Sequence, residues 1–291
     1  MKRREFLSTV VEAEDRVQKK TRRKFVPSEF ANKALPVVPR SASGLEPYAG
    51  PWGPVQAAHL LRRTMFGARP QDVVSASAMT VSGLVDLLLS EPAAPDPPIN
   101  TNINDTGSVV GTTWINAPTS ASNNSRHNSM RAWWVSLMLE QGMSLREKMT
   151  LFWHNHFVTE TAVVSDARVS YRTNALLRQY ALGNFKELTR HATVDCGMLR
   201  YLNGNTNTAA NPNENYAREL QELFTIGKGP EIAPENYTNY TEQDVQQAAR
   251  VLSGWRDDKT TFTGYFTANR HDAGDKQFSP AYQNTVVAGQ A

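Results

Sequence analysis

The sequence predicts a mainly α-helical fold, an irregular multi-helix globular domain with long loops and at most a small C-terminal β hairpin. Three observations support this expectation. Apolar residues recur at the three- and four-residue spacing of amphipathic helices from Gln56 to Trp255. Residues that cap helices stand at the ends of several of these segments. Before residue 260, no run of alternating apolar and polar residues indicates a strand.

Local signals place the individual helices. Ser144 and Glu147 have the spacing of a capping box at the start of one helix, and Asn211 fits the N-cap of another that Gly227 would end. Thr241 fits a third N-cap. The predicted helices cover residues 56–66, 80–90, 131–141, 145–157, 169–182, 185–192, 198–204, 211–227 and 241–255. The alternating segment 260–267 is the candidate strand of the hairpin.

Composition divides the chain into three parts. Residues 1–50 are basic and then rich in proline, serine and alanine, without periodicity, so we expect a disordered arm. Residues 51–276 form the helical domain, which contains a loop insertion at about 91–128 that is rich in proline, asparagine, threonine and glycine. A loop of that length is usually functional or disordered. Residues 277–291 are expected to be an incomplete C-terminal tail.

Charge and cysteine content narrow the classes of function. The formal net charge is +3 and no basic stripe is visible, so nucleic-acid binding is not expected. The single cysteine, Cys196, excludes an internal disulfide. It is either a nucleophile near His191 or, as the sequence favours, a small buried apolar residue. No apolar run is long enough to predict a transmembrane helix.

The N-terminus leaves the location of the protein open. Residues 3–7, RREFL, resemble a twin-arginine export signal, but Glu12 and Glu14 interrupt the apolar stretch that should follow. The segment is therefore a degenerate export signal or, as we favour, a charged tail. The protein is accordingly cytoplasmic or exported.

Two histidines one residue apart, His154 and His156, are the first candidates for chemistry. On a helix they point to opposite faces and cannot hold one metal ion together. His156 continues the apolar stripe of Leu145, Met149 and Phe152, so we expect it to be buried and His154 to be half exposed. The alternative is a metal-binding or acid–base role for at least one of the two.

Carboxylates supply further candidates. Glu219 lies beside the apolar stripe of its helix, where it needs a partner: Arg172, Arg178 or Arg200 in a structural ion pair, or a ligand in a functional one. Glu214 and Glu222 are expected to face solvent. His271, which precedes Asp272, is a weak candidate for a ligand set or a relay. The common hydrolase, nucleotide-binding and zincin motifs are absent from the sequence.

Five segments follow one another within residues 55–276: AAHLLRRTMFGARPQDV, REKMTLFWHNHF, LLRQYALGNFKELTRHATVDCGMLRYLNG, NPNENYARELQELFTIG and YTEQDVQQAARVLSGW. Together, in this order, they resemble a known bacterial family, the domain of unknown function 1800. The resemblance implies a bacterial origin and a predominantly helical fold, but no activity. It also implies frequent export and, as a partner, a protein of the domain of unknown function 1501 family.

The chain departs from this family pattern at two places. Cys196-Gly197 stands where the family usually has a proline-containing turn. Family members also continue beyond His271-Asp272, so the chain resembles a C-terminally truncated member.

Two functions remain in competition at this level. The first is a non-catalytic assembly or cell-envelope interaction protein, which the lack of a catalytic motif slightly favours. The second is a metal- or acid–base-dependent enzyme. Its catalytic residues would come from His154, His156, Glu219 and Asn215, and a divalent metal would be held by His154, His156, Glu219 and His271.

Overall fold

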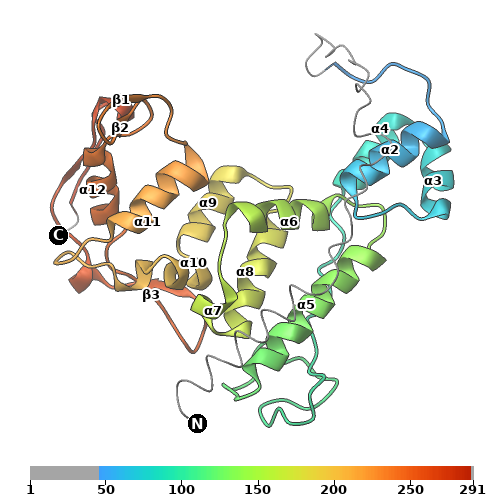
Figure 1. Cartoon of the computed structure of the whole chain (residues 1–291), viewed down its shortest axis with the longest axis horizontal. Helices are drawn as coiled ribbons and strands as arrows, with labels where there is room; N and C mark the ends of the chain where they lie inside the picture. Colours follow the sequence, from blue (N-terminus) through green and yellow to red (C-terminus); the bar gives the residue numbers. More distant parts are fainter. Residues whose placement is uncertain (1–45, 290–291) are drawn as a thin grey trace, which may run out of the picture. The chain divides into compact units, whose positions relative to one another are not determined.

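The computed structural model describes residues 46–289. The chain divides into two units, Met1–Ala49 and Gly50–Ala291, and the second contains every helix and strand of the described residues. Apart from residues 46–50, the predicted disordered arm lies outside the described residues. The mainly α-helical fold is confirmed, as Figure 1 shows.

Three helices form a small cluster at the start of the second unit. They are α2 (Pro54–Thr64), α3 (Pro70–Ser77) and α4 (Val81–Leu89). Each contributes apolar side chains to a shared core, including the fully buried Leu61 and Leu84. Thr80 caps α4 by accepting a hydrogen bond from the backbone N–H of Gly83 at 3.0 Å.

The central part of the unit is built around α8. This helix (Ala167–Gln179) packs against α5 (Asn123–Glu140), α6 (Arg146–His156), α9 (Phe185–Thr193) and α10 (Cys196–Tyr201), and the short α7 (Thr161–Val164) precedes it (Figure 1). Side chains of α8, α9 and α10 join Phe157 and Phe224 in the largest apolar cluster. The neighbours on both sides bury one face of α8 almost completely.

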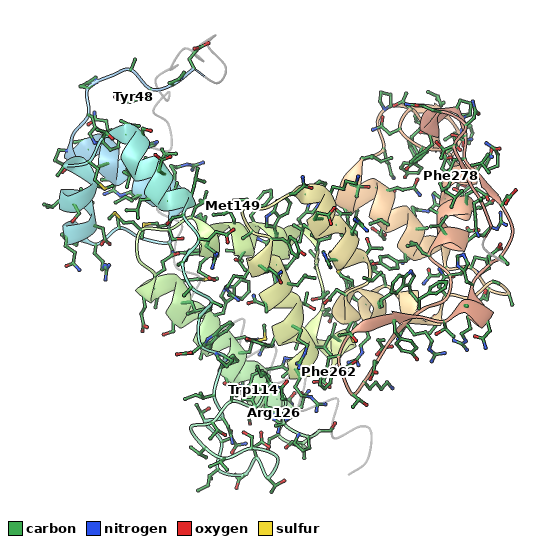
Figure 2. The ribbon with its side chains drawn as sticks, turned by 180° about the vertical axis from the view of Figure 1, so that it is seen from behind. Tyr48, Trp114, Arg126, Met149, Phe262 and Phe278 are labelled. Carbon is green, nitrogen blue, oxygen red and sulfur yellow. The ribbon has the colours of Figure 1, made fainter. Side chains whose placement is uncertain are left out.

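The insertion before α5 is folded onto the domain. Helix α5 begins at Asn123, eight residues earlier than the predicted Arg131. Trp114, which is fully buried, donates from Nε1 to Ser129 Oγ at 3.1 Å. Asp105 accepts two hydrogen bonds from Arg126, at 2.6 and 2.9 Å. Figure 2 shows Trp114 and Arg126 close together at the beginning of α5.

The last part combines α11 (Glu214–Glu219) and α12 (Glu242–Val251) with short hairpins. Thr241 caps α12 as predicted, in a capping box with Asp244. Within residues 46–289 there are three two-stranded antiparallel sheets, where one hairpin at most was expected. They pair β1 (Glu231–Ala233) with β2 (Asn236–Tyr237), β3 (Trp255–Asp257) with β4 (Gly264–Phe266), and β5 (Lys276–Gln277) with β6 (Val286–Val287).

The strand that the alternation predicted is β4, and two further hairpins form from strands of two or three residues. Strands this short cannot display an alternating pattern, which explains why the sequence did not reveal them. No helix in the described part of the chain is long and apolar enough to cross a bilayer.

The π-helical turn Leu220–Thr225 directly continues α11 and changes the face that the helix buries. A π turn adds about one residue to the turn, so side chains beyond it rotate relative to an α-helical pattern. The helical spacing places Leu220, Leu223 and Phe224 on one apolar stripe. Phe224 is buried and Leu220 packs against the same cluster, as expected, but Leu223 is 58% exposed and Gln221 is buried in addition. The predicted stripe is therefore wrong at Leu223.

The apolar stripe predicted for α6 is also wrong. Its buried residues are Glu147 and Thr150, and Phe157 follows at the C-cap, while Phe152 is 54% exposed. The capping box predicted from Ser144 and Glu147 does not form: Ser144 Oγ accepts from the backbone N–H of Arg146 at 3.2 Å. The carboxylate of Glu147 instead faces α8, because a buried arginine lies there.

Candidate functional site

The two histidines of α6 have separate environments. The ring of His154 lies 5.0 Å from that of Trp134, and burial lowers its pKa. His156 is hydrogen-bonded through Nε2 to the backbone carbonyl oxygen of Phe224, at 2.8 Å. Both histidines are half buried, so His156 is less buried than expected. The predicted divergence of positions i and i+2 explains why their contacts differ.

The carboxylate of Glu219 has no hydrogen-bond or ion-pair partner within residues 46–289, and the neighbouring Asn215 is exposed. Glu222, which was expected to face solvent, is the paired carboxylate of this helix. It accepts a hydrogen bond from Tyr240 Oη at 2.9 Å and forms an ion pair with Lys228 at 2.7 Å. The π turn accounts for this exchange, because it rotates Glu222 toward Tyr240 and Lys228.

His271 belongs to a different set of contacts. Its Nδ1 lies 2.8 Å from the backbone oxygen of Ser253, and its Nε2 lies 3.3 Å from the Nζ of the buried Lys276. This network assigns the proton to Nδ1, since an ammonium can only donate to Nε2. The carboxylate of Asp272 accepts two hydrogen bonds from Arg250, which hold its pKa at about 2.

The four predicted metal ligands, His154, His156, Glu219 and His271, are therefore not brought together. Among the residues that the structure describes, no group of three or more histidine, cysteine or acidic side chains could hold a metal ion. Cys196 is buried, and burial raises the pKa of its thiol to about 12. A thiol with that pKa stays protonated near neutral pH, which disfavours a nucleophilic role.

A buried layer of polar side chains between α5, α6 and α8 was not foreseen. Arg178 donates to both oxygens of Glu147, from Nε to Oε1 at 2.7 Å and from Nη2 to Oε2 at 3.0 Å. Trp134 Nε1 donates to Oε2 of the same carboxylate at 2.9 Å. The guanidinium of Arg178 also lies 4.9 Å from the ring centre of Trp133. This carboxylate is thus fully neutralised by its neighbours.

Two further buried polar side chains, one in α8 and one in α5, have atoms without a hydrogen-bond partner among the described residues. Asn174 is completely buried in α8, and neither atom of its side-chain amide is hydrogen-bonded in the described part of the chain. His127 in α5 is 5% exposed, and its Nε2 has no partner there either. Unpaired buried polar atoms are rare in folded proteins and call for a physical explanation.

A groove runs along α5, next to the buried polar layer of Glu147, Arg178 and Trp134. It consists of two pockets, of about 530 and 740 Å³, which share Leu137 and Glu140 of α5. The proline-rich residues 92–101 form its other wall. At one end, Arg146 Nη1 donates to the backbone oxygen of Pro92 at 2.5 Å, which fixes this wall to α6.

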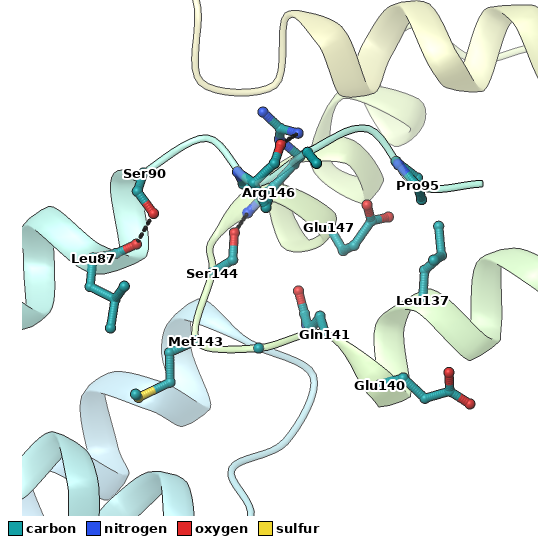
Figure 3. A pocket seen from close by; sticks show the side chains of 13 residues that line it. Leu87, Ser90, Pro95, Leu137, Glu140, Gln141, Met143, Ser144, Arg146 and Glu147 are labelled. Atoms are coloured by element: carbon teal, nitrogen blue, oxygen red, sulfur yellow. Dashed lines mark hydrogen bonds between the residues drawn. The ribbon is translucent and has the colours of Figure 1, made fainter. Parts of the chain in front are cut away.

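The first of these pockets combines an apolar lining with one unpaired acceptor. Leu87, Leu137 and Met143 line it together with Gln141 and Glu147. Figure 3 shows the side chain of Gln141 directed toward that of Glu147 among the residues that line this pocket. The Oε1 atom of Gln141 is buried and has no hydrogen-bond partner among residues 46–289. A ligand that donates a hydrogen bond would satisfy it.

Comparisons with known proteins identify one match. The model of the family described as "Protein of unknown function (DUF1800)" matches residues 59–288. No curated protein and no solved structure is significantly similar to the chain.

Proposed function

We propose, from the premise that the chain belongs to the family "Protein of unknown function (DUF1800)", that it is a non-catalytic assembly protein that binds another polypeptide in the groove beside α5. The observation that carries this proposal is the combination of an apolar groove with a neutralised polar layer below it. A groove of this kind offers a partner chain both apolar contact area and hydrogen-bonding groups.

The polar layer supports binding rather than catalysis. Glu147, the acidic residue that reaches the groove from below, accepts hydrogen bonds from both Arg178 and Trp134. Both of its carboxylate oxygens are thus held by donors from the neighbouring helices. Its contacts hold α5, α6 and α8 together and give the groove a fixed floor.

The groove walls favour an extended polypeptide. One wall is a segment without regular secondary structure that contains Pro92, Pro95 and Pro97, and the other is the helix face that carries Leu137. Apolar side chains of the partner would occupy the two pockets, and a backbone N–H could donate to Gln141 Oε1. The family resemblance suggests a protein of the domain of unknown function 1501 family as the partner, in an assembly at the cell envelope.

The experiment is a titration of the purified chain with a purified protein of that second family, followed by calorimetry. We expect saturable binding that Leu137→Glu weakens by at least about tenfold, because a carboxylate would be buried against the partner. Leu223→Glu is the matched control, since Leu223 is exposed on the π turn and outside the groove. Equal weakening by both variants, or no binding, contradicts the proposal.

The alternative function is a metal- or acid–base-dependent enzyme that uses the His154, His156 and Glu219 region. The lowered pKa of His154 favours it, because a neutral imidazole near physiological pH can accept a proton or ligate a metal. Elemental analysis of the purified protein separates the two functions. A stoichiometric transition metal that is lost in His156→Ala supports the enzyme, and a metal-free protein that only loses stability supports the assembly protein.

A further inference from the structure

A separate polar pocket lies between the first half of α5 and the segment that carries α7. Its volume is about 630 Å³, within the size range of small-molecule sites. Asparagine, threonine and serine side chains line it beside His127, Arg131 and Glu160. It shares no lining residue with the pockets of the groove.

His127 gives this pocket an unsatisfied hydrogen-bonding group. The residue is 5% exposed and lines the pocket, and its Nε2 has no partner within the described range 46–289. Burial lowers the pKa of His127, and the positive charge of Arg131 lowers it further. The imidazole is therefore neutral, and Nε2 can either accept or donate one hydrogen bond from a ligand.

Two opposite charges on the same pocket are also free. The guanidinium of Arg131 donates to Asn128 Oδ1 at 3.0 Å, but it forms no ion pair with any described residue. The carboxylate of Glu160 likewise has no ion-pair partner in the part of the chain that the structure describes. A ligand with one negative and one positive group would match both.

The pocket walls are held in place by Asn123. Its Nδ2 donates to the backbone oxygen of Ser165 at 2.9 Å, and its Oδ1 accepts from the backbone N–H of Ala167 at 2.9 Å. Ser165 has a positive φ of 52°, which is uncommon for a residue other than glycine. These bonds tie α5 to the α7–α8 connection, so the pocket is formed before a ligand arrives.

We propose that this pocket binds a free α-amino acid. The carboxylate of the ligand pairs with Arg131, its ammonium group pairs with Glu160, and one of these groups supplies the partner that His127 Nε2 lacks. A phosphate dianion fits less well, because the pocket offers a single guanidinium and a carboxylate would repel it. The site is independent of the proposed polypeptide groove.

The test is a calorimetric titration of the whole chain with each free proteinogenic amino acid, with the ring resonances of His127 followed by NMR. We expect at least one amino acid to bind with a Kd of about 1 mM or lower and to shift those resonances. Arg131→Gln and Glu160→Gln should each weaken binding by about tenfold or more. Both residues are exposed, so neither variant should prevent folding.

Two variants serve as controls. Arg190→Gln removes an exposed arginine on α9 that pairs with Glu187, and it should leave binding unchanged. Leu137→Glu, which alters the groove, should also leave it unchanged. The proposal is overturned if no amino acid binds below about 10 mM. It is equally overturned if the deaminated acid binds as well as the amino acid, or if inorganic phosphate binds more tightly.

Discussion

Arg178 and Glu147 form a two-point ion pair in the centre of the helical domain, with N–O distances of 2.7 and 3.0 Å. Their side chains are 6% and 8% exposed, so water cannot replace either partner. The pair joins the first turn of α6 to the last turn of α8. Both side chains lie where an apolar contact between these helices would otherwise be expected.

Removal of one partner should be strongly destabilising. We expect Arg178→Met to lower the free energy of unfolding by about 3–5 kcal/mol, because Glu147 would remain buried without its cation. The double variant Glu147→Leu/Arg178→Met should recover much of this loss, since it leaves no unpaired charge. Urea unfolding measures both, with Arg190→Met as a surface control. A double variant no more stable than Arg178→Met would show that the pair does not act as a unit.

This pair also shows what sequence reasoning could and could not reach. Local signals located some helix ends: Thr241 starts α12, and Gly227 has the positive φ of 69° that suits the end of the preceding helix. They were wrong at others, because Asn213 and not Asn211 caps α11, and the capping box of Ser144 does not form. Periodicity assumes that buried residues are apolar. It therefore assigned Glu147 to a cap and Phe152 to the core, the reverse of what the packing requires.

The π turn is also the reason why the contacts of Glu219 and Glu222 were predicted wrongly. It changes the helical pitch, and no residue in the segment indicates that change. The buried layer was missed because its members come from three helices, and only tertiary packing brings Trp134 and Arg178 to the same carboxylate. The unpaired Nε2 of His127 is invisible in a sequence for the same reason.

The π turn makes a direct prediction about two glutamates. Glu222→Gln should lower the free energy of unfolding by about 0.5–1.5 kcal/mol, because it weakens the contacts with Tyr240 and Lys228. Glu219→Gln should change it by less than about 0.5 kcal/mol, since this carboxylate has no partner among residues 46–289. Chemical denaturation of both variants is the measurement. A larger loss of stability in Glu219→Gln than in Glu222→Gln would contradict this prediction and support an uninterrupted α-helix in which Glu219 is the paired carboxylate.

Acid should weaken the insertion before α5 in a defined pH window. Hydrogen bonds from Arg126 hold the pKa of Asp105 at about 2, although burial alone would raise it. An unfolded aspartate has a pKa of about 3.9. Because the folded value is the lower one, the stability from Asp105 is complete above about pH 4 and is lost as the pH falls toward 2.

The measurement is the free energy of unfolding between about pH 5 and pH 2, compared with that of Asp105→Asn. The variant should be less stable than the parent at the upper end, and the difference should shrink as the pH falls through the window. Arg126 stays charged throughout, so its own ionisation does not contribute. A difference that is independent of pH would show that Asp105 acts only through its shape.

The C-terminal segment that begins at Ser279 should be required for the stability of α12. The buried carboxylate of Asp244 accepts from the backbone N–H of Ser279 at 2.7 Å and from its Oγ at 2.6 Å, in addition to the bonds of its own helix cap. Tyr282 Oη donates to Gln221 Oε1 at 2.8 Å, which fastens the same segment to the π turn. We therefore expect a chain that ends at Phe278 to lose about 2–4 kcal/mol of unfolding free energy, because hydrogen bonds to a buried charge would be removed. Ser279→Ala should lose part of this unfolding free energy. Ser90→Ala, which removes an exposed hydroxyl bonded to Leu87, should lose almost none.

Thermal and urea unfolding of these chains measure the effect. A shortened chain as stable as the parent would show that α12 does not need this segment. The expected loss would show that residues 279–289 contribute to the core of the domain.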